Sequence, residues 1–132
     1  MGDRYFELQE AQAMISQLEE LFNYLSGLRE EVVKIHSEIQ KLEGVSYNNG
    51  GGDTPKMLGE YHRALDEALA HIKAVIEPFQ EQGVIIKSIE DGLVDFPFLR
   101  QGQPVYLCWK MGEVEIKYWH DLNSGFAGRQ IL

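Results

Sequence analysis

Residues 11–42 read AQAMISQLEELFNYLSGLREEVVKIHSEIQKL. Apolar residues recur in this stretch alternately three and four positions apart, at Ala11, Met14, Leu18, Leu21, Leu25, Leu28, Val32, Ile35, Ile39 and Leu42. A mean spacing of 3.5 is the coiled-coil period, which keeps one apolar seam facing a partner helix. The pattern therefore predicts a helix from about residue 8 to about residue 43, roughly 50 Å long at a rise of 1.5 Å per residue. Gly44 is expected to end it.

The partner helix follows a glycine-rich connection over residues 45–52, which we expect to be a flexible loop. Thr54 is suited to the N-cap and Pro55 to the first helical position. The second helix has its own seam with the same spacing, at Leu58, Tyr61, Leu65, Ala68, Ile72, Val75 and Phe79. A short connection returns it antiparallel along the first, giving a helical hairpin over about residues 8–82.

One flank of the seam is apolar near the chain ends and carries histidines toward the loop. Its members are Ile15, Phe22, Arg29, His36, His62, Leu69 and Ile76. The opposite flank of the first helix is mostly polar and consists of Glu10, Gln17, Tyr24, Glu31 and Glu38. We expect the rest of the chain to dock on the apolar flank, with Trp109, Ile116 and Tyr118 against Phe22, Leu69 or Ile76.

Residues 84–121 predict a four-stranded antiparallel meander. Stretches 84–89 and 93–98 flank a loop at 90–92, with Lys87 opposite Asp95. Stretches 104–111 and 114–121 flank Gly112-Glu113, which suits a type II′ turn and sets Val105 opposite His120. In this register His120 shares a face with Trp109, whereas Cys108 lies on the other face, opposite Lys117. The tail, residues 122–132, is too rich in glycine for regular structure.

Composition narrows the class of protein. A chain of 132 residues predicts one domain over residues 1–132, and its net charge of −9 argues against nucleic acid and anionic membranes as partners. No apolar run is long enough to span a bilayer, and the first residues lack a secretory segment. The single cysteine, Cys108, excludes an internal disulfide. We therefore expect a cytoplasmic protein.

Several motifs resemble a bacterial family catalogued as domain of unknown function 2203. They are GLVDFP at 92–97, VYLCW at 105–109, GE at 112–113, YWHD at 118–121 and GFAGRQ at 125–130, with FELQEA at 6–11 resembling the family's start. Glu7 stands where the family pattern has Thr or Ser as a helix N-cap. The resemblance spans nearly the whole chain and implies a family name without an activity.

Two readings of the C-terminal motif remain open. In one, His120 is a base or metal ligand, Asp95 or Asp121 is its partner, and Arg129 clamps a small anion. Gly125 and Gly128 would return Arg129 toward the strand end through positive φ angles. In the other, His120 closes the sheet by bonding a tail carbonyl and Arg129 neutralises a carboxylate, since structural histidines and ion pairs outnumber catalytic ones.

A second candidate site lies on the helices. Folding the hairpin brings His36 and His62 within about one helical turn, and Asp66 could supply a third ligand for a divalent metal. No Cys-x-x-Cys or His-Glu-x-x-His spacing accompanies them, so no cofactor is predicted, and a divalent metal is the alternative. Cys108 has no evident histidine partner, which disfavours a nucleophile.

The sequence therefore predicts an α+β protein: a long antiparallel coiled-coil-like hairpin with a C-terminal four-stranded antiparallel meander packed at its base. Its activity stays unknown. The favoured class is a non-catalytic interaction or scaffold module that forms a homodimer. The alternative is a small ligand-binding or metal-binding protein or enzyme, with its site near Asp95, His120, Asp121 and Arg129.

Overall fold

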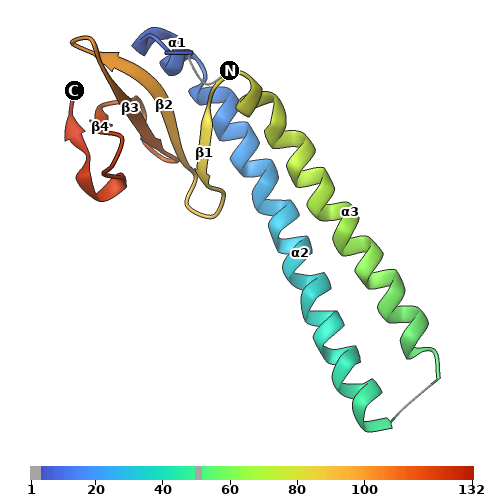
Figure 1. The fold of residues 1–132 in the computed structure, drawn as a ribbon. Coiled ribbons are helices and arrows are strands. Elements are labelled where there is room, and N and C mark those ends of the chain that lie inside the picture. The colour runs from blue at the N-terminus through green and yellow to red at the C-terminus, as the bar shows by residue number, and fades with distance from the viewer. Residues whose placement is uncertain (1–3, 50–51) are drawn as a thin grey trace. The chain divides into compact units, whose positions relative to one another are not determined.

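The computed structural model describes residues 4–49 and 52–132. Three helices come first: α1 (Leu8–Ala13), α2 (Ile15–Asn49) and α3 (Thr54–Glu81). Strands β1 (Ile85–Ser88), β2 (Leu93–Arg100), β3 (Gln103–Lys110), β4 (Tyr118–His120) and β5 (Gln130–Ile131) follow, with the 3-10 helix η1 (Phe126–Gly128) before β5. They form one antiparallel sheet in the order β1-β2-β3-β4-β5 (Figure 1). The α+β class is confirmed, and the number of strands is corrected from four to five.

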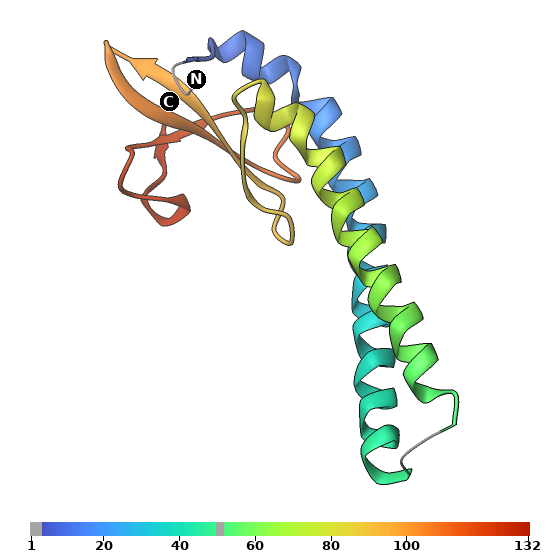
Figure 2. The same ribbon diagram turned by 45° about the vertical axis from the view of Figure 1, so that its right-hand side comes forward.

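The chain forms two compact units, one of residues 24–75 and one of residues up to 23 together with 76–132. A single domain over 1–132 stays a prediction. The first unit is the hairpin, in which α2 and α3 run side by side in opposite directions (Figure 2). A polar contact joins the two helices, because the Tyr24 hydroxyl of α2 lies 2.6 Å from His71 Nε2 of α3.

The first helix differs from its prediction at both ends. It is interrupted at Met14, whose N–H bonds the Ala11 carbonyl at 3.0 Å, so α1 is a separate short helix. Glu7 occupies the N-cap position and its N–H donates to the Glu10 carboxylate at 2.9 Å. Helix α2 continues through Gly44 to Asn49, because one glycine costs a helix only about 1 kcal/mol and does not oblige it to stop. Gly50 and Gly51 of the predicted loop lie outside the described residues.

Helix α3 begins at Thr54, one residue before the predicted first helical position, and contains Pro78. Its end is set by Gly83, which has a φ of +100° that a residue with a side chain rarely adopts. A Cβ there would also lie 3.3 Å from the Phe6 ring. The Val84 N–H returns to the Phe79 carbonyl at 3.1 Å, which satisfies one of the last helical carbonyls.

One face of the sheet packs on aromatic residues of its own unit, Phe6 before α1 and Phe22 in α2. Phe96 meets Phe6 edge-on with ring centroids 5.2 Å apart, and Trp109 lies 6.3 Å from Phe22. All four rings are buried. The predicted docking of Trp109 against Phe22 is confirmed, whereas Leu69, in the hairpin unit, is 49% exposed.

The first hairpin of the sheet has a different register from the predicted one. Asp95 pairs with Ile85 rather than Lys87, and Leu93 pairs with Ser88 rather than Ile89. The loop is longer because the Ser88 hydroxyl and the backbone and side chain of Asp91 bond each other across it. Gly92, the last residue of the predicted loop, has a positive φ of +65°, which glycine adopts readily.

The register of β3 and β4 is also corrected, by one residue. The turn is Lys110–Glu113, closed by a 3.0 Å bond from the Glu113 N–H to the Lys110 carbonyl, and β4 begins only at Tyr118. His120 therefore pairs with Tyr106 instead of Val105. Because side chains alternate along a strand, this single step moves His120 to the face opposite Trp109.

The tail is structured, contrary to prediction. Strand β5 pairs with β4, joining Tyr118 to Ile131 and Trp119 to Gln130. Before it, η1 contains Gly128, where a Cβ would lie only 2.6 Å from the Ser124 Cβ. Neither Gly125 nor Gly128 has a positive φ, contrary to prediction. Glycine is needed at position 128 because Ser124 approaches its backbone too closely to leave room for a side chain.

Candidate functional site

Three strands bring Asp95, Cys108 and His120 together on the sheet face opposite Trp109. Asp95 of β2 pairs directly with Cys108 of β3, and His120 of β4 pairs with Tyr106, two residues from Cys108. The exposed fractions of the three residues are 1%, 0% and 3%. One ligand atom from each side chain lies within 4.8 Å of those of the other two. The cluster is therefore compact, polar and buried.

Both ring nitrogens of His120 have partners. Nδ1 lies 2.8 Å from the Asp121 carbonyl oxygen, and Nε2 lies 3.1 Å from Asp95 Oδ1. A carbonyl oxygen can only accept, so Nδ1 carries a hydrogen. Nε2 faces Asp95 Oδ1, and a hydrogen bond between them needs one more proton, carried either by Nε2 or by the Asp95 carboxyl. This bond links β4 to β2 across β3.

Burial and the neighbouring Asp95 carboxylate raise the pKa of the Cys108 thiol to about 12. The positive charge of Arg129 opposes this shift more weakly. The thiol is therefore protonated near neutral pH, which argues against Cys108 as a nucleophile in the metal-free protein. The histidine neighbour of Cys108 was not predicted, because an error of one residue in the β3–β4 register placed His120 on the other face of the sheet.

Arg129 returns to the sheet, but its carboxylate partner is Glu113. Arg129 Nη2 lies 2.7 and 2.6 Å from the two Glu113 oxygens, and the guanidinium stacks on the rings of Tyr118 and Phe126. A weaker bond of 3.5 Å runs from Nη2 to the Cys108 carbonyl oxygen. Glu113 therefore neutralises the residue predicted to clamp an anion.

Asp121 contributes its backbone rather than its side chain. Its carboxylate accepts the N–H groups of Ser124 and Asn123 at 2.9 and 3.2 Å. The Ser124 hydroxyl, followed by these two backbone N–H groups, holds the pKa of the exposed Asp121 carboxyl below its ordinary value. Of the four predicted residues, Asp95 and His120 meet directly, Asp121 joins through its carbonyl, and Arg129 lies beside the Cys108 backbone.

The helical histidines remain exposed. His36 lies on α2 and His62 on α3. Among residues 4–49 and 52–132, the three-residue group with ligand atoms in mutual reach is Asp95, Cys108 and His120, and His36, His62 and Asp66 do not form a second one.

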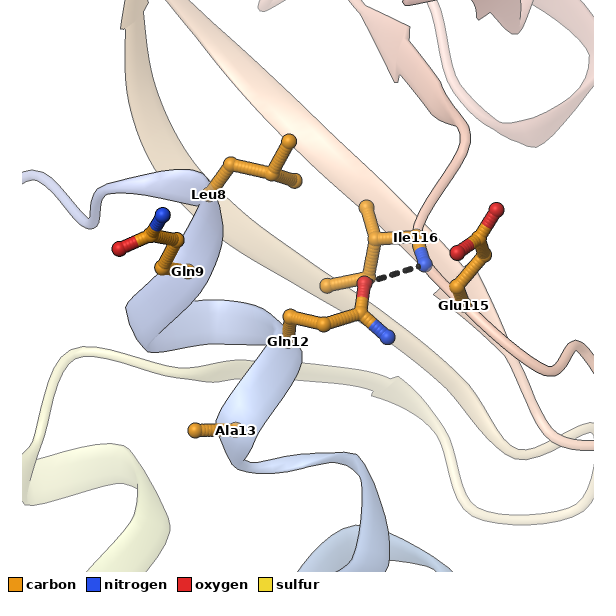
Figure 3. Close-up of a pocket in the computed structure, with 6 residues that line it drawn as sticks. All are labelled: Leu8, Gln9, Gln12, Ala13, Glu115 and Ile116. Atoms are coloured by element: carbon orange, nitrogen blue, oxygen red, sulfur yellow. Dashed lines mark hydrogen bonds between the residues drawn. The ribbon is translucent and has the colours of Figure 1, made fainter.

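A groove of about 540 Å³ lies between α1 and the segment before β4 (Figure 3). It is lined by Leu8, Gln9, Gln12, Ala13, Glu115 and Ile116. The Gln12 side-chain oxygen already accepts the Ile116 N–H at 2.9 Å. Glu115 is the one ionisable residue in this lining, so the groove offers no pair of groups for acid–base chemistry.

The fold and the cluster define the class: an α+β protein that combines a long helical hairpin with an antiparallel sheet carrying a buried Asp-Cys-His group. The chain belongs to the family described as "Uncharacterized conserved protein (DUF2203)", whose model matches residues 4–132. The match confirms the family inferred from the C-terminal motifs. No curated protein and no solved structure matches the chain. Within the described part of the chain, none of the helices is both long and apolar enough to cross a membrane.

Proposed function

We propose that this protein is a non-catalytic interaction module that forms a homodimer through its helical hairpin. The observation that carries the proposal is the exposure of the seam in residues 24–75. Among the described residues of this unit, Leu25 and Ile39 are the buried apolar side chains, while the other seam residues are only half-buried. Two helices leave the edges of their seam open to water, whereas four helices surround it.

Exposed apolar side chains extend the incompletely covered surface. Four large apolar side chains of this unit are exposed to water: Tyr24 (51%), Val33 (56%), Met57 (41%) and Leu69 (49%). Two of them lie on α2 and two on α3. Large apolar side chains exposed along the hairpin favour a protein partner over bulk water. A second copy of the same hairpin is the partner with a matching length and spacing, and it would form a symmetric interface.

The charge distribution favours the hairpin as the meeting surface. Residues 24–75 carry six Lys or Arg and eight Asp or Glu, so they hold −2 of the chain's net charge of −9. Two copies therefore repel each other less through this unit than through the rest of the chain. The same overall charge opposes nucleic acid and anionic lipid as partners. We place the protein in the cytoplasm.

A catalytic role is not favoured, because the Cys108 thiol is buried with a raised pKa and Glu113 neutralises Arg129. A small anionic ligand would have to compete with the Glu113 carboxylate for the guanidinium. The interaction module therefore remains the function with the stronger support.

Light scattering of the full chain tests the proposal, with a dimer mass expected at micromolar concentrations. Leu69→Gln and Val33→Gln should each weaken the dimer at least about tenfold, because burial of such a side chain contributes about 1.5–3 kcal/mol. Lys73→Gln and Lys34→Gln are matched controls at exposed positions of the same helices. A monomer mass well above micromolar concentration would contradict self-association. A dimer unaffected by either apolar substitution would contradict the role of the hairpin.

A further inference from the structure

The buried polar cluster carries an inference that is independent of self-association. We propose that Asp95, Cys108 and His120 bind a divalent transition metal of the zinc class. The three residues supply a carboxylate oxygen, a sulfur and an imidazole nitrogen, all within 4.8 Å of one another. These are the three ligand types found in protein zinc sites. They come from adjacent strands of one sheet, which is a rigid support for a metal centre.

The orientation of His120 matches that of a metal ligand. Metal-binding histidines nearly always donate their second ring N–H to a carbonyl or carboxylate, which fixes the tautomer and aims the other nitrogen at the metal. His120 Nδ1 makes this bond to the Asp121 carbonyl at 2.8 Å. Nε2 is left facing Asp95 Oδ1, 3.1 Å away. The neutral tautomer required for ligation is thus the one that the backbone selects.

Charge balance also fits a divalent ion. A thiolate and a carboxylate together offset the two positive charges, so the loaded site would be neutral where its residues are at most 3% exposed. The nearby cation is Arg129, and its guanidinium is neutralised by Glu113 at 2.6 Å. The metal would therefore meet little net repulsion from that side.

The ligand set distinguishes among metals. Sulfur ligands select zinc, cobalt and similar ions over calcium and magnesium, which prefer oxygen. Three protein ligands leave one position of a tetrahedral ion for water or another small ligand. The competing explanation is a metal-free hydrogen-bond network that joins β2, β3 and β4.

Cobalt(II) distinguishes the two explanations in the wild-type full chain. Protein stripped with chelator and titrated with cobalt(II) alone should bind about one equivalent per chain. It should show the charge-transfer absorption of a cobalt–thiolate bond and the visible bands of a four-coordinate ion. Zinc(II) should displace the cobalt and raise the melting temperature. Folded wild-type protein without a cobalt–thiolate band would overturn the proposal, and this measurement needs no variant.

Variants then assign the ligands. Cys108→Ser should abolish the charge-transfer band, and Cys108→Ser and His120→Ala should each weaken zinc binding more than about 100-fold, beyond the loss typical of outer-shell partners. The double variant His36→Ala, His62→Ala removes the two helical histidines that the sequence made candidate metal ligands, and it should bind like wild type. Zinc binding that survives in folded Cys108→Ser and His120→Ala but disappears in the double variant would overturn the assignment. If His120→Ala fails to fold, Cys108→Ser and the wild-type spectrum decide.

Discussion

Replacing Phe22 with Ala should destabilise the unit formed by residues up to 23 and 76–132. Phe22 is 5% exposed, and its ring centroid lies 6.3 Å from that of Trp109, which is fully buried. Truncating a buried phenylalanine costs about 3–5 kcal/mol through lost transfer energy and the cavity left behind. The aromatic contact accounts for about 0.5–1.5 kcal/mol of such a loss. The expected loss is a large part of the roughly 5–15 kcal/mol that stabilises a typical domain.

Denaturant unfolding at a fixed protein concentration measures this cost, with circular dichroism for the helices and tryptophan fluorescence for the surroundings of Trp109. Fixed concentration matters because self-association would add to the apparent stability. Tyr5→Ala is the matched control, since it removes another aromatic ring from the same unit at a site that is 40% exposed. A loss below about 1 kcal/mol for Phe22→Ala, or a loss equal to that of Tyr5→Ala, would refute Phe22 as part of the core.

Two further substitutions test the tail. Gly128→Ala should destabilise the protein by about 1–3 kcal/mol through overpacking, because the added Cβ would lie 2.6 Å from the Ser124 Cβ. Adding Ser124→Gly to this variant should recover most of the loss in a thermal melt. No recovery would contradict the contact. Asp121→Ala should lower the melting temperature at neutral pH. The folded-state pKa of Asp121 lies below its ordinary value of 3.8, so the carboxylate stabilises the fold above that value and loses its effect as the pH falls through the folded-state pKa. A difference from wild type that persists undiminished at still lower pH would argue against a charge effect.

The helices could be predicted because their information is local. The apolar spacing in residues 11–42 and 58–79 is read along one helix at a time, and Thr54 with Pro55 marks a start that needs no distant partner. The same locality explains the error at Gly44, since a single glycine leaves the end of a helix undecided. The break at Met14 had no local signal of comparable strength.

Strand register was harder to predict because it depends on contacts distant in sequence. The Ile116 N–H donates to Gln12 Oε1, and the Trp109 indole donates to the Glu113 carbonyl oxygen. The first bond engages a residue of the predicted strand 114–121, and the second engages Glu113 of the predicted two-residue turn. One residue of slip then placed His120 on the wrong face and hid its proximity to Cys108.

The sequence alone determined the α+β class, the two helical seams and the family. It named Asp95 and Asp121 as the two candidate carboxylate partners of His120. It also contained a signal that went unused. The two-residue turn Gln101-Gly102, with both φ angles positive, sets the register that places Asp95 beside Cys108. Only the tertiary structure decided that His120 completes this group and that Glu113 neutralises Arg129. Those contacts join strands and a tail whose relative register is fixed by packing and hydrogen bonds across the sheet, and no local pattern of residues encodes it.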